Sequence, residues 1–282
     1  MNALEINGLR KSYKDFELEN VSFSLPSGCI LGLIGENGAG KSTIIKLILN
    51  MISRDGGTIT VLGKDNKENF ELTKEDIGVV LDDIGFPECI TAQQVNNIMK
   101  YTYKNWNEKL YYEYIRQFDI PEKKQFKEYS RGTKMKLGIA VALSHDPKLL
   151  ILDEATNGLD PVVRDEITDI FSEFTRDESH TILISSHIVS DLEKICDYIA
   201  FLHKGKLMLC EEKDRLLEEY VLVQCSADDF TRIRKEGVKG VKKSVYNIEA
   251  VVERRCVPAG IRVIPVTIEE LFVFMVKEGR AV

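Results

Sequence analysis

Short apolar runs without charged residues mark the strands of a buried sheet. They lie at residues 30–34, 77–81, 149–152 and 181–185, and stretches with a helical spacing of apolar positions separate them. A strand that is apolar throughout is covered on both faces, and strands that alternate with helices form a mainly parallel sheet. The pattern therefore predicts an α/β fold.

Two stretches near the N-terminus and one in the middle follow other patterns. Residues 3–9 and 16–25 alternate apolar and polar positions, as half-buried strands do. Residues 91–143 have a helical texture and contain the single tryptophan among several tyrosines. This aromatic cluster is either the core of a helical subdomain or part of a partner interface, where Tyr and Trp are enriched. Its members are Tyr101, Tyr103, Trp106, Tyr111, Tyr112 and Tyr114.

The C-terminal stretch restarts the strand and helix pattern after a charged run. It closes on a predicted helix at residues 267–276 that begins with a threonine cap. We therefore predict two units. The first is residues 1–216, with its helical subdomain at about 86–143, and the second is a small α/β extension at 217–282.

Composition narrows the setting in which the chain works. The net charge of −7 disfavours non-specific nucleic-acid binding, which needs a basic surface. The six cysteines are scattered without a CxxC pair, so reduced thiols are expected, as in cytoplasm. The apolar runs are shorter than the roughly 20 residues of a membrane span, and the first residues lack the apolar core of a signal peptide. A soluble intracellular protein is predicted, with any membrane role through a partner.

A glycine-rich loop follows the first apolar run. Gly35 and Gly40 bracket four residues, and Lys41 and Ser42 open an apolar-periodic helix. This spacing fits a phosphate-binding loop, in which backbone N–H groups wrap a phosphate and the helix start adds further donors. Lys41 would reach the outer phosphates, and the Ser42 hydroxyl would ligate Mg²⁺. The plainer interpretation is a glycine-rich turn before a helix.

Two carboxylates follow the third apolar run. Asp153 and Glu154 end a buried strand, where charge is costly unless it has a partner. Beside Mg²⁺ and ATP, Asp153 would hold the metal, directly or through water, and Glu154 would orient and polarise the attacking water.

With these motifs in order, the chain resembles the ATP-binding subunit of an ABC (ATP-binding cassette) transporter from residue 3 to about 210. The resemblance rests on GENGAGKS in the phosphate loop and on LLILDEATNGLDP. It implies a P-loop ATPase core with an antiparallel β subdomain and a helical subdomain. It also implies that Tyr13 stacks on adenine, that Asp160 belongs to the D-loop, which communicates across a dimer, and that His187 contacts the γ-phosphate. The implied nucleotide-binding residues of the phosphate loop are Gly35, Asn37, Gly38, Ala39, Gly40, Lys41, Ser42 and Thr43.

Two motifs depart from the family pattern. The signature segment, usually LSGGQ, reads YSRGT, and in the family it binds the γ-phosphate of ATP held by the opposite subunit. Its candidate contact residues are Ser130, Arg131, Gly132 and Thr133. Asp82 stands where the family usually has the Q-loop glutamine. We predict that the Asp82 carboxylate faces Mg²⁺ when ATP is bound and swings away when the site is empty.

The resemblance implies a transport ATPase that works as a homodimer or with a related ATPase, on separate integral membrane permease subunits. Such a protein sits on the cytoplasmic face of the membrane. Within the family, the chain resembles bacterial drug- or peptide-export ATPases, including those of GntR-regulated antibiotic-response operons. The shared features are the VVLDD segment, the run KMKLGIAVALSHDPKLLILDE and the small C-terminal extension. The alternatives are a soluble ABC ATPase acting on nucleic acid or ribosomes, which usually has long inserts or two cassettes, and an unrelated P-loop kinase or GTPase. This chain has no long insert, second cassette or basic surface, and a kinase or GTPase has no reason to carry a signature segment, a D-loop and a switch histidine together.

Overall fold

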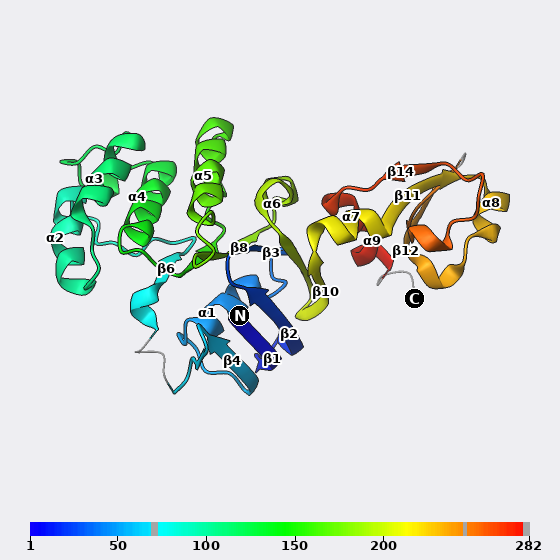
Figure 1. Cartoon of the computed structure of the whole chain (residues 1–282), viewed down its shortest axis with the longest axis horizontal. Coiled ribbons are helices and arrows are strands. Elements are labelled where there is room, and N and C mark those ends of the chain that lie inside the picture. Colours follow the sequence, from blue (N-terminus) through cyan, green and yellow to red (C-terminus); the bar gives the residue numbers. More distant parts are fainter. Residues whose placement is uncertain (69–72, 245–246, 279–282) are drawn as a thin grey trace.

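The computed structural model describes residues 1–68, 73–244 and 247–278. Three sheets organise this part of the chain (Figure 1). The first sheet is antiparallel, with strand order β2 (Glu17–Pro26), β1 (Asn2–Ser12), β4 (Gly56–Val61) and β5 (Lys64–Asp65). The second has the order β10 (Lys206–Glu212), β9 (Tyr198–His203), β3 (Ile30–Gly35), β8 (Thr181–Ser186), β7 (Leu149–Asp153) and β6 (Ile77–Val80). The third is antiparallel, with the order β12 (Val238–Lys243), β13 (Ile248–Glu253), β11 (Tyr220–Cys225) and β14 (Val263–Pro265).

The second sheet is the predicted parallel sheet, and all four apolar runs are strands in it. Only its edge strand β10 runs antiparallel to its neighbour. The helices of the described chain are α1 (Lys41–Ile48), α2 (Ala92–Thr102), α3 (Glu108–Gln117), α4 (Arg131–Leu143), α5 (Pro161–Phe174), α6 (Val189–Ile195), α7 (Lys213–Glu219), α8 (Ala227–Arg232) and α9 (Ile268–Glu278). Short 3₁₀ turns lie at Lys74–Asp76, Phe126–Glu128, Lys235–Gly237 and Arg254–Cys256.

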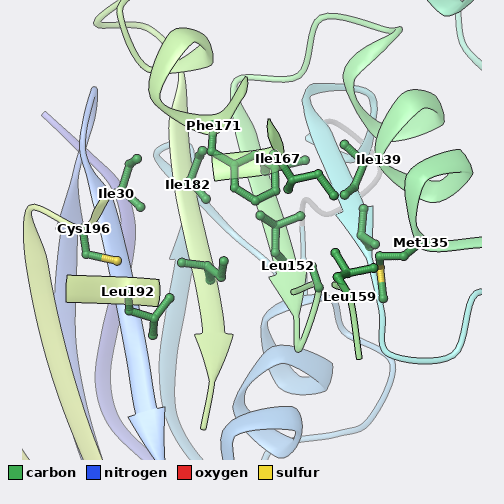
Figure 2. Close-up of a cluster of buried hydrophobic side chains, with 14 of the residues drawn as sticks. Ile30, Met135, Ile139, Leu152, Leu159, Ile167, Phe171, Ile182, Leu192 and Cys196 are labelled. Atoms are coloured by element: carbon green, nitrogen blue, oxygen red, sulfur yellow. The ribbon is translucent and has the colours of Figure 1, made fainter. Parts of the chain in front are cut away.

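Successive side chains of a strand point to opposite faces of the sheet, and in the parallel strands both faces are covered and buried. One face packs under α4, α5 and α6, where Leu152 of β7 and Ile182 of β8 meet Phe171 of α5 (Figure 2). The other face packs on α1 and on the first antiparallel sheet, with Ile151 and Leu183 in that second core. The covered sheet holds the loops at its strand ends in fixed positions.

The aromatic cluster is mostly the core of the helical region formed by α2, α3 and α4. Tyr111 is fully buried, its hydroxyl donates to the carbonyl of Ala92 at 2.8 Å, and burial raises its pKa well above the usual value. Trp106 Nε1 donates to the Asn96 side chain at 2.9 Å. The structure therefore favours the core interpretation for these rings, and Tyr101 is the member that is 94% exposed.

The C-terminal sheet lies at the end of the molecule opposite the helical region (Figure 1). Its closing helix α9 has the predicted cap, since Thr267 Oγ1 accepts from the N–H of Glu270 at 3.1 Å. This helix packs against α6 of the core, and the rings of Phe272 and Phe201 lie 5.1 Å apart. The predicted unit boundary at residue 216 falls inside α7 and remains a prediction.

All six cysteines are free, as the sequence predicts. Burial raises the pKa of the Cys210 thiol to about 12 and raises that of Cys196 further. These two thiols therefore stay protonated and behave as apolar groups.

Candidate functional site

The phosphate-loop sequence adopts the predicted strand, loop and helix. Strand β3 ends at Gly35, and α1 begins at Lys41 after a left-handed Gly40 with φ +111°. A Cβ atom at Gly40 would lie 2.7 Å from Cζ of Phe16, which is closer than two carbon atoms can pack. Glycine is therefore required at position 40 both for its backbone angle and for the space that Phe16 takes.

A pocket of about 620 Å³ opens above this loop. Its walls come from the loop, the start of α1 and the ends of strands β6, β7 and β8. The lining residues are Asp15, Phe16, Glu36, Asn37, Gly38, Ala39, Gly40, Lys41, Ser42, Thr43, Asp82, Glu154, Asn157 and His187. The sheet thus brings together side chains that lie far apart in the sequence, at the carboxyl ends of parallel strands, where α/β proteins bind ligands.

Two buried side chains, Lys41 and Glu154, and the more exposed His187 (37%) form a group that we call the buried charge cluster. Lys41 Nζ lies 3.2 Å from Glu154 Oε1, and His187 Nδ1 lies 2.7 Å from Glu154 Oε2. The side chains of Lys41 and Glu154 are only 5% and 12% exposed. Lys41 also donates to the carbonyl of Gly35 at 2.7 Å. The ammonium group therefore folds back over its own loop and is partly neutralised by Glu154.

The backbone of Glu154 is in an unusual conformation for a residue with a side chain. Its φ is +52°, in the left-handed region that non-glycine residues rarely adopt. Its N–H group donates to the carbonyl and to the hydroxyl of Ser185, at 3.1 and 3.2 Å. These bonds to the neighbouring strand β8 hold the turn, and they aim the carboxylate at Lys41 and His187.

The oxygen ligands predicted for a metal come from three elements. Ser42 and Asp82 line the pocket, whereas Asp153 is buried at the end of β7 and accepts from the Ser185 hydroxyl at 2.5 Å. In the described chain, no group of three His, Cys, Asp or Glu side chains could hold a metal ion. Hydroxyl and carboxylate oxygens nevertheless fit Mg²⁺, which commonly binds to one or two carboxylates together with phosphates and water. The donor set suits a metal that arrives with a nucleotide.

The aromatic side chain at the pocket is Phe16, which the sequence analysis did not select. Tyr13 does not line the pocket; it is 48% exposed, and its ring lies 6.5 Å from that of Phe16. Both residues belong to the same turn, because the N–H of Tyr13 donates to the Phe16 carbonyl. The stacking role of Tyr13 remains a prediction, and Phe16 is a second candidate.

The two motifs that depart from the family pattern meet in an exposed ion pair outside the phosphate loop. Arg131 Nη2 donates to Asp82 Oδ1, and the two side chains are 53% and 54% exposed. Ser130 caps α4, since its hydroxyl accepts from the N–H of Thr133 at 3.1 Å. The signature residues do not line the pocket of their own subunit, whereas Asp82 does.

The predicted D-loop lies beside the signature segment. Asp160 caps α5, because its Oδ1 accepts from the N–H groups of Val162 and Val163 at 3.1 Å each. A Cβ atom built on Gly132 would lie 3.4 Å from the side chain of Leu159. The signature segment and Leu159 therefore lie side by side, and neither they nor Asp160 line the pocket, whereas Asn157 does.

Comparisons with known proteins show which family the chain belongs to. The ABC transporter family model matches residues 18–157. The lantibiotic transport ATP-binding protein SrtF of Streptococcus pyogenes is 37% identical over 214 residues, which are 75% of this chain and 91% of SrtF. The bacitracin transport ATP-binding protein BcrA of Enterococcus faecalis is 34% identical over 209 residues, 73% of this chain and 68% of BcrA. A solved structure of an ATP-binding subunit of an ABC transporter superposes with a TM-score of 0.69 at 27% identity, covering 76% of this chain and 91% of the other.

The relatives are transport proteins, so they support the transport interpretation and not the soluble alternative that acts on nucleic acid or ribosomes. The fold agrees with the same family. The chain belongs to the ATP-binding subunits of ABC transporters, the ATPases that hydrolyse ATP to power transport.

Proposed function

We propose that the 620 Å³ pocket binds ATP with Mg²⁺ and that Glu154 positions the water that attacks the terminal phosphate. The observation that carries this proposal is the buried charge cluster, in which Lys41, Glu154 and His187 converge beside the phosphate loop. A lysine that contacts a carboxylate in this way can turn its ammonium group to a bound triphosphate. That movement would free the Glu154 carboxylate.

Each residue of the pocket then has a separate role in ATP binding and hydrolysis. Backbone N–H groups of the loop hold the phosphates, and Lys41 neutralises their charge. Ser42, Asp153 and Asp82 would hold Mg²⁺, which supplies charge neutralisation when bound. Glu154 accepts a hydrogen bond from the water while the water oxygen attacks the terminal phosphorus. The bond between that phosphorus and the bridging oxygen breaks, which releases ADP and phosphate. His187, bonded to Glu154 at 2.7 Å, keeps that carboxylate oriented.

We propose a dimer, either of two copies or with a related ATPase, with the signature residues of each subunit facing the ATP of the other. The signature residues support this, because Ser130 and Arg131 stand at the start of a 13-residue helix that does not face its own pocket. A helix start with an arginine attracts phosphate. The protein's net charge of −7 supports a partner other than nucleic acid.

The membrane partner would be a permease subunit, with this protein held on the cytoplasmic face and export as the direction of transport. Within the described residues, no helix has the length and apolar character to cross a bilayer. The names of SrtF and BcrA support a peptide-type substrate, since they are lantibiotic and bacitracin transport proteins. The contact surface would be α2, where Ile98 and Tyr101 are 46% and 94% exposed. Apolar and aromatic side chains left open to water in this way are typical of interaction sites.

Co-purification with the permease tests this surface. Ile98→Ala combined with Tyr101→Ala should abolish recovery of the ATPase with the membrane subunit, while the ATPase rate of the isolated protein stays within about twofold. Met51→Ala is the matched control, because Met51 is also exposed and apolar but follows α1. Retained co-purification of the α2 variant would place the contact elsewhere.

A further inference from the structure

The exposed pair of Asp82 and Arg131 joins both places where this sequence departs from its family. Asp82 replaces a glutamine that cannot carry a charge, and Arg131 replaces a glycine that has no side chain. Neither family residue could form an ion pair, yet here the two replacements are bonded to each other. The pair crosses 49 residues of sequence and links the end of β6 to the start of α4.

Arg131 also lies beside the predicted D-loop, residues 157–160. A Cβ atom built on Gly158, which has a φ of +75°, would lie 3.5 Å from Arg131 Cδ and 3.6 Å from its guanidinium carbon. The arginine stem therefore crosses the turn at the one D-loop residue without a side chain. The Arg131 side chain thus extends from the signature segment past the D-loop to Asp82 within one subunit.

Asp82 stands between two pockets. It lines the nucleotide pocket with Lys41 and Glu154, and it lines a second pocket of about 280 Å³ together with Arg131. In this structure, Arg131 neutralises one of the carboxylates around the nucleotide pocket. Because both partners are more than half exposed, water screens the pair and it can be broken by a stronger anion.

We propose that Arg131 exchanges the Asp82 carboxylate for the terminal phosphate of the ATP held by the opposite subunit. This inference rests on the proposed dimer. A phosphate oxygen carries more charge than a carboxylate oxygen and matches the planar guanidinium group equally well. The exchange leaves Asp82 without its cation at the moment the dimer closes, and its carboxylate becomes available to the metal site of its own subunit. Dimer closure at one nucleotide is thus coupled to the metal ligands of the other.

The exchange predicts opposite effects for the two halves of the pair. In a Glu154→Gln background, which slows hydrolysis, the ATP concentration for half-maximal dimerisation is measured by sedimentation at saturating Mg²⁺. Adding Arg131→Gly removes the phosphate contact and should raise that concentration about tenfold or more. Adding Asp82→Asn removes the competing partner of Arg131 and should lower it about two- to fivefold, the range of an exposed ion pair. Asp82→Asn should have no such effect when Arg131→Gly is also present.

The matched control is Lys134→Ala, which removes a cation one turn along α4 that lies over the Phe126 ring instead. An equal loss of dimerisation in this variant would assign the effect of Arg131 to general charge and overturn the proposal. If Asp82→Asn and Arg131→Gly both weakened dimerisation, the two residues would form a fixed structural pair, and the proposal would also be overturned. If the Glu154→Gln protein itself gave no ATP-dependent dimer, the proposed dimer would be contradicted, and the exchange that depends on it would be contradicted as well.

Discussion

The nucleotide site contains two groups of paired charges that differ in their exposure to water. In the buried charge cluster, Lys41 and Glu154 are 5% and 12% exposed. In the exposed pair, Asp82 and Arg131 are both more than half exposed, although one of them lines the same pocket. A buried pair is costly to break, because the remaining charge is left without water or partner, whereas an exposed pair exchanges partners easily. We infer that the buried contact of Lys41 with Glu154 is released only for the triphosphate that replaces it, whereas the exposed pair exchanges its partner at little cost.

The largest expected effect on ligand binding comes from the buried charge cluster. Lys41→Ala removes the charge that the phosphates would meet, and it should weaken ATP binding about a hundredfold. Titration with a fluorescent ATP analogue measures this directly. Lys46→Ala serves as the control, since Lys46 lies on the same helix but does not line the pocket. Equal affinity in the Lys41 variant and the wild type would show that the loop does not hold the phosphates.

A second prediction compares both groups in the protein without nucleotide. Glu154→Gln leaves the buried Lys41 ammonium without a counter-ion and should lower the free energy of unfolding by about 2 kcal/mol. Asp82→Asn breaks an exposed pair and should change it by less than about 0.5 kcal/mol. Urea denaturation of both variants gives the two values. Similar values would remove the distinction between a tightly held cluster and an easily exchanged pair.

The smallest effect concerns the metal. If the Asp82 carboxylate reaches Mg²⁺ in the ATP-bound state, Asp82→Asn should raise the Mg²⁺ concentration for half-maximal hydrolysis about threefold. Nucleotide binding without Mg²⁺ should be unchanged, and Asp82→Gln, the usual family residue, should support activity. An Asp82→Ala variant with the wild-type Mg²⁺ dependence would make Asp82 a bystander at the metal.

The elements of the fold that could be predicted from the sequence are those that depend on a local pattern of residues. The four apolar runs are strands of the central sheet, and the glycine spacing of the phosphate loop gives the expected turn into α1. Strand β12 was not predicted because Val238–Lys243, VKGVKK, has three lysines and a glycine and thus no apolar run. Its pairing with β13, and not its own composition, makes it a strand.

The candidate site shows the same division between local and long-range information. Lys41 and Glu154 follow from motifs, but the left-handed backbone of Glu154 depends on Ser185 of the next strand, 31 residues away. The placement of Phe16 instead of Tyr13 at the pocket depends on how the turn before β2 lies against Gly40. The bond of Asp82 to Arg131 needs the folded helical region. None of these contacts has a periodic signal in the sequence.

The central claim is that Glu154, within the buried charge cluster, positions the attacking water. The most direct test is the rate of phosphate release by Glu154→Gln at saturating ATP and Mg²⁺, with bound ATP counted in the same sample. Glutamine keeps the size of the side chain but loses the carboxylate, so turnover should fall about a thousandfold while ATP remains bound and a dimer accumulates. Turnover at the wild-type rate in this variant would contradict the account.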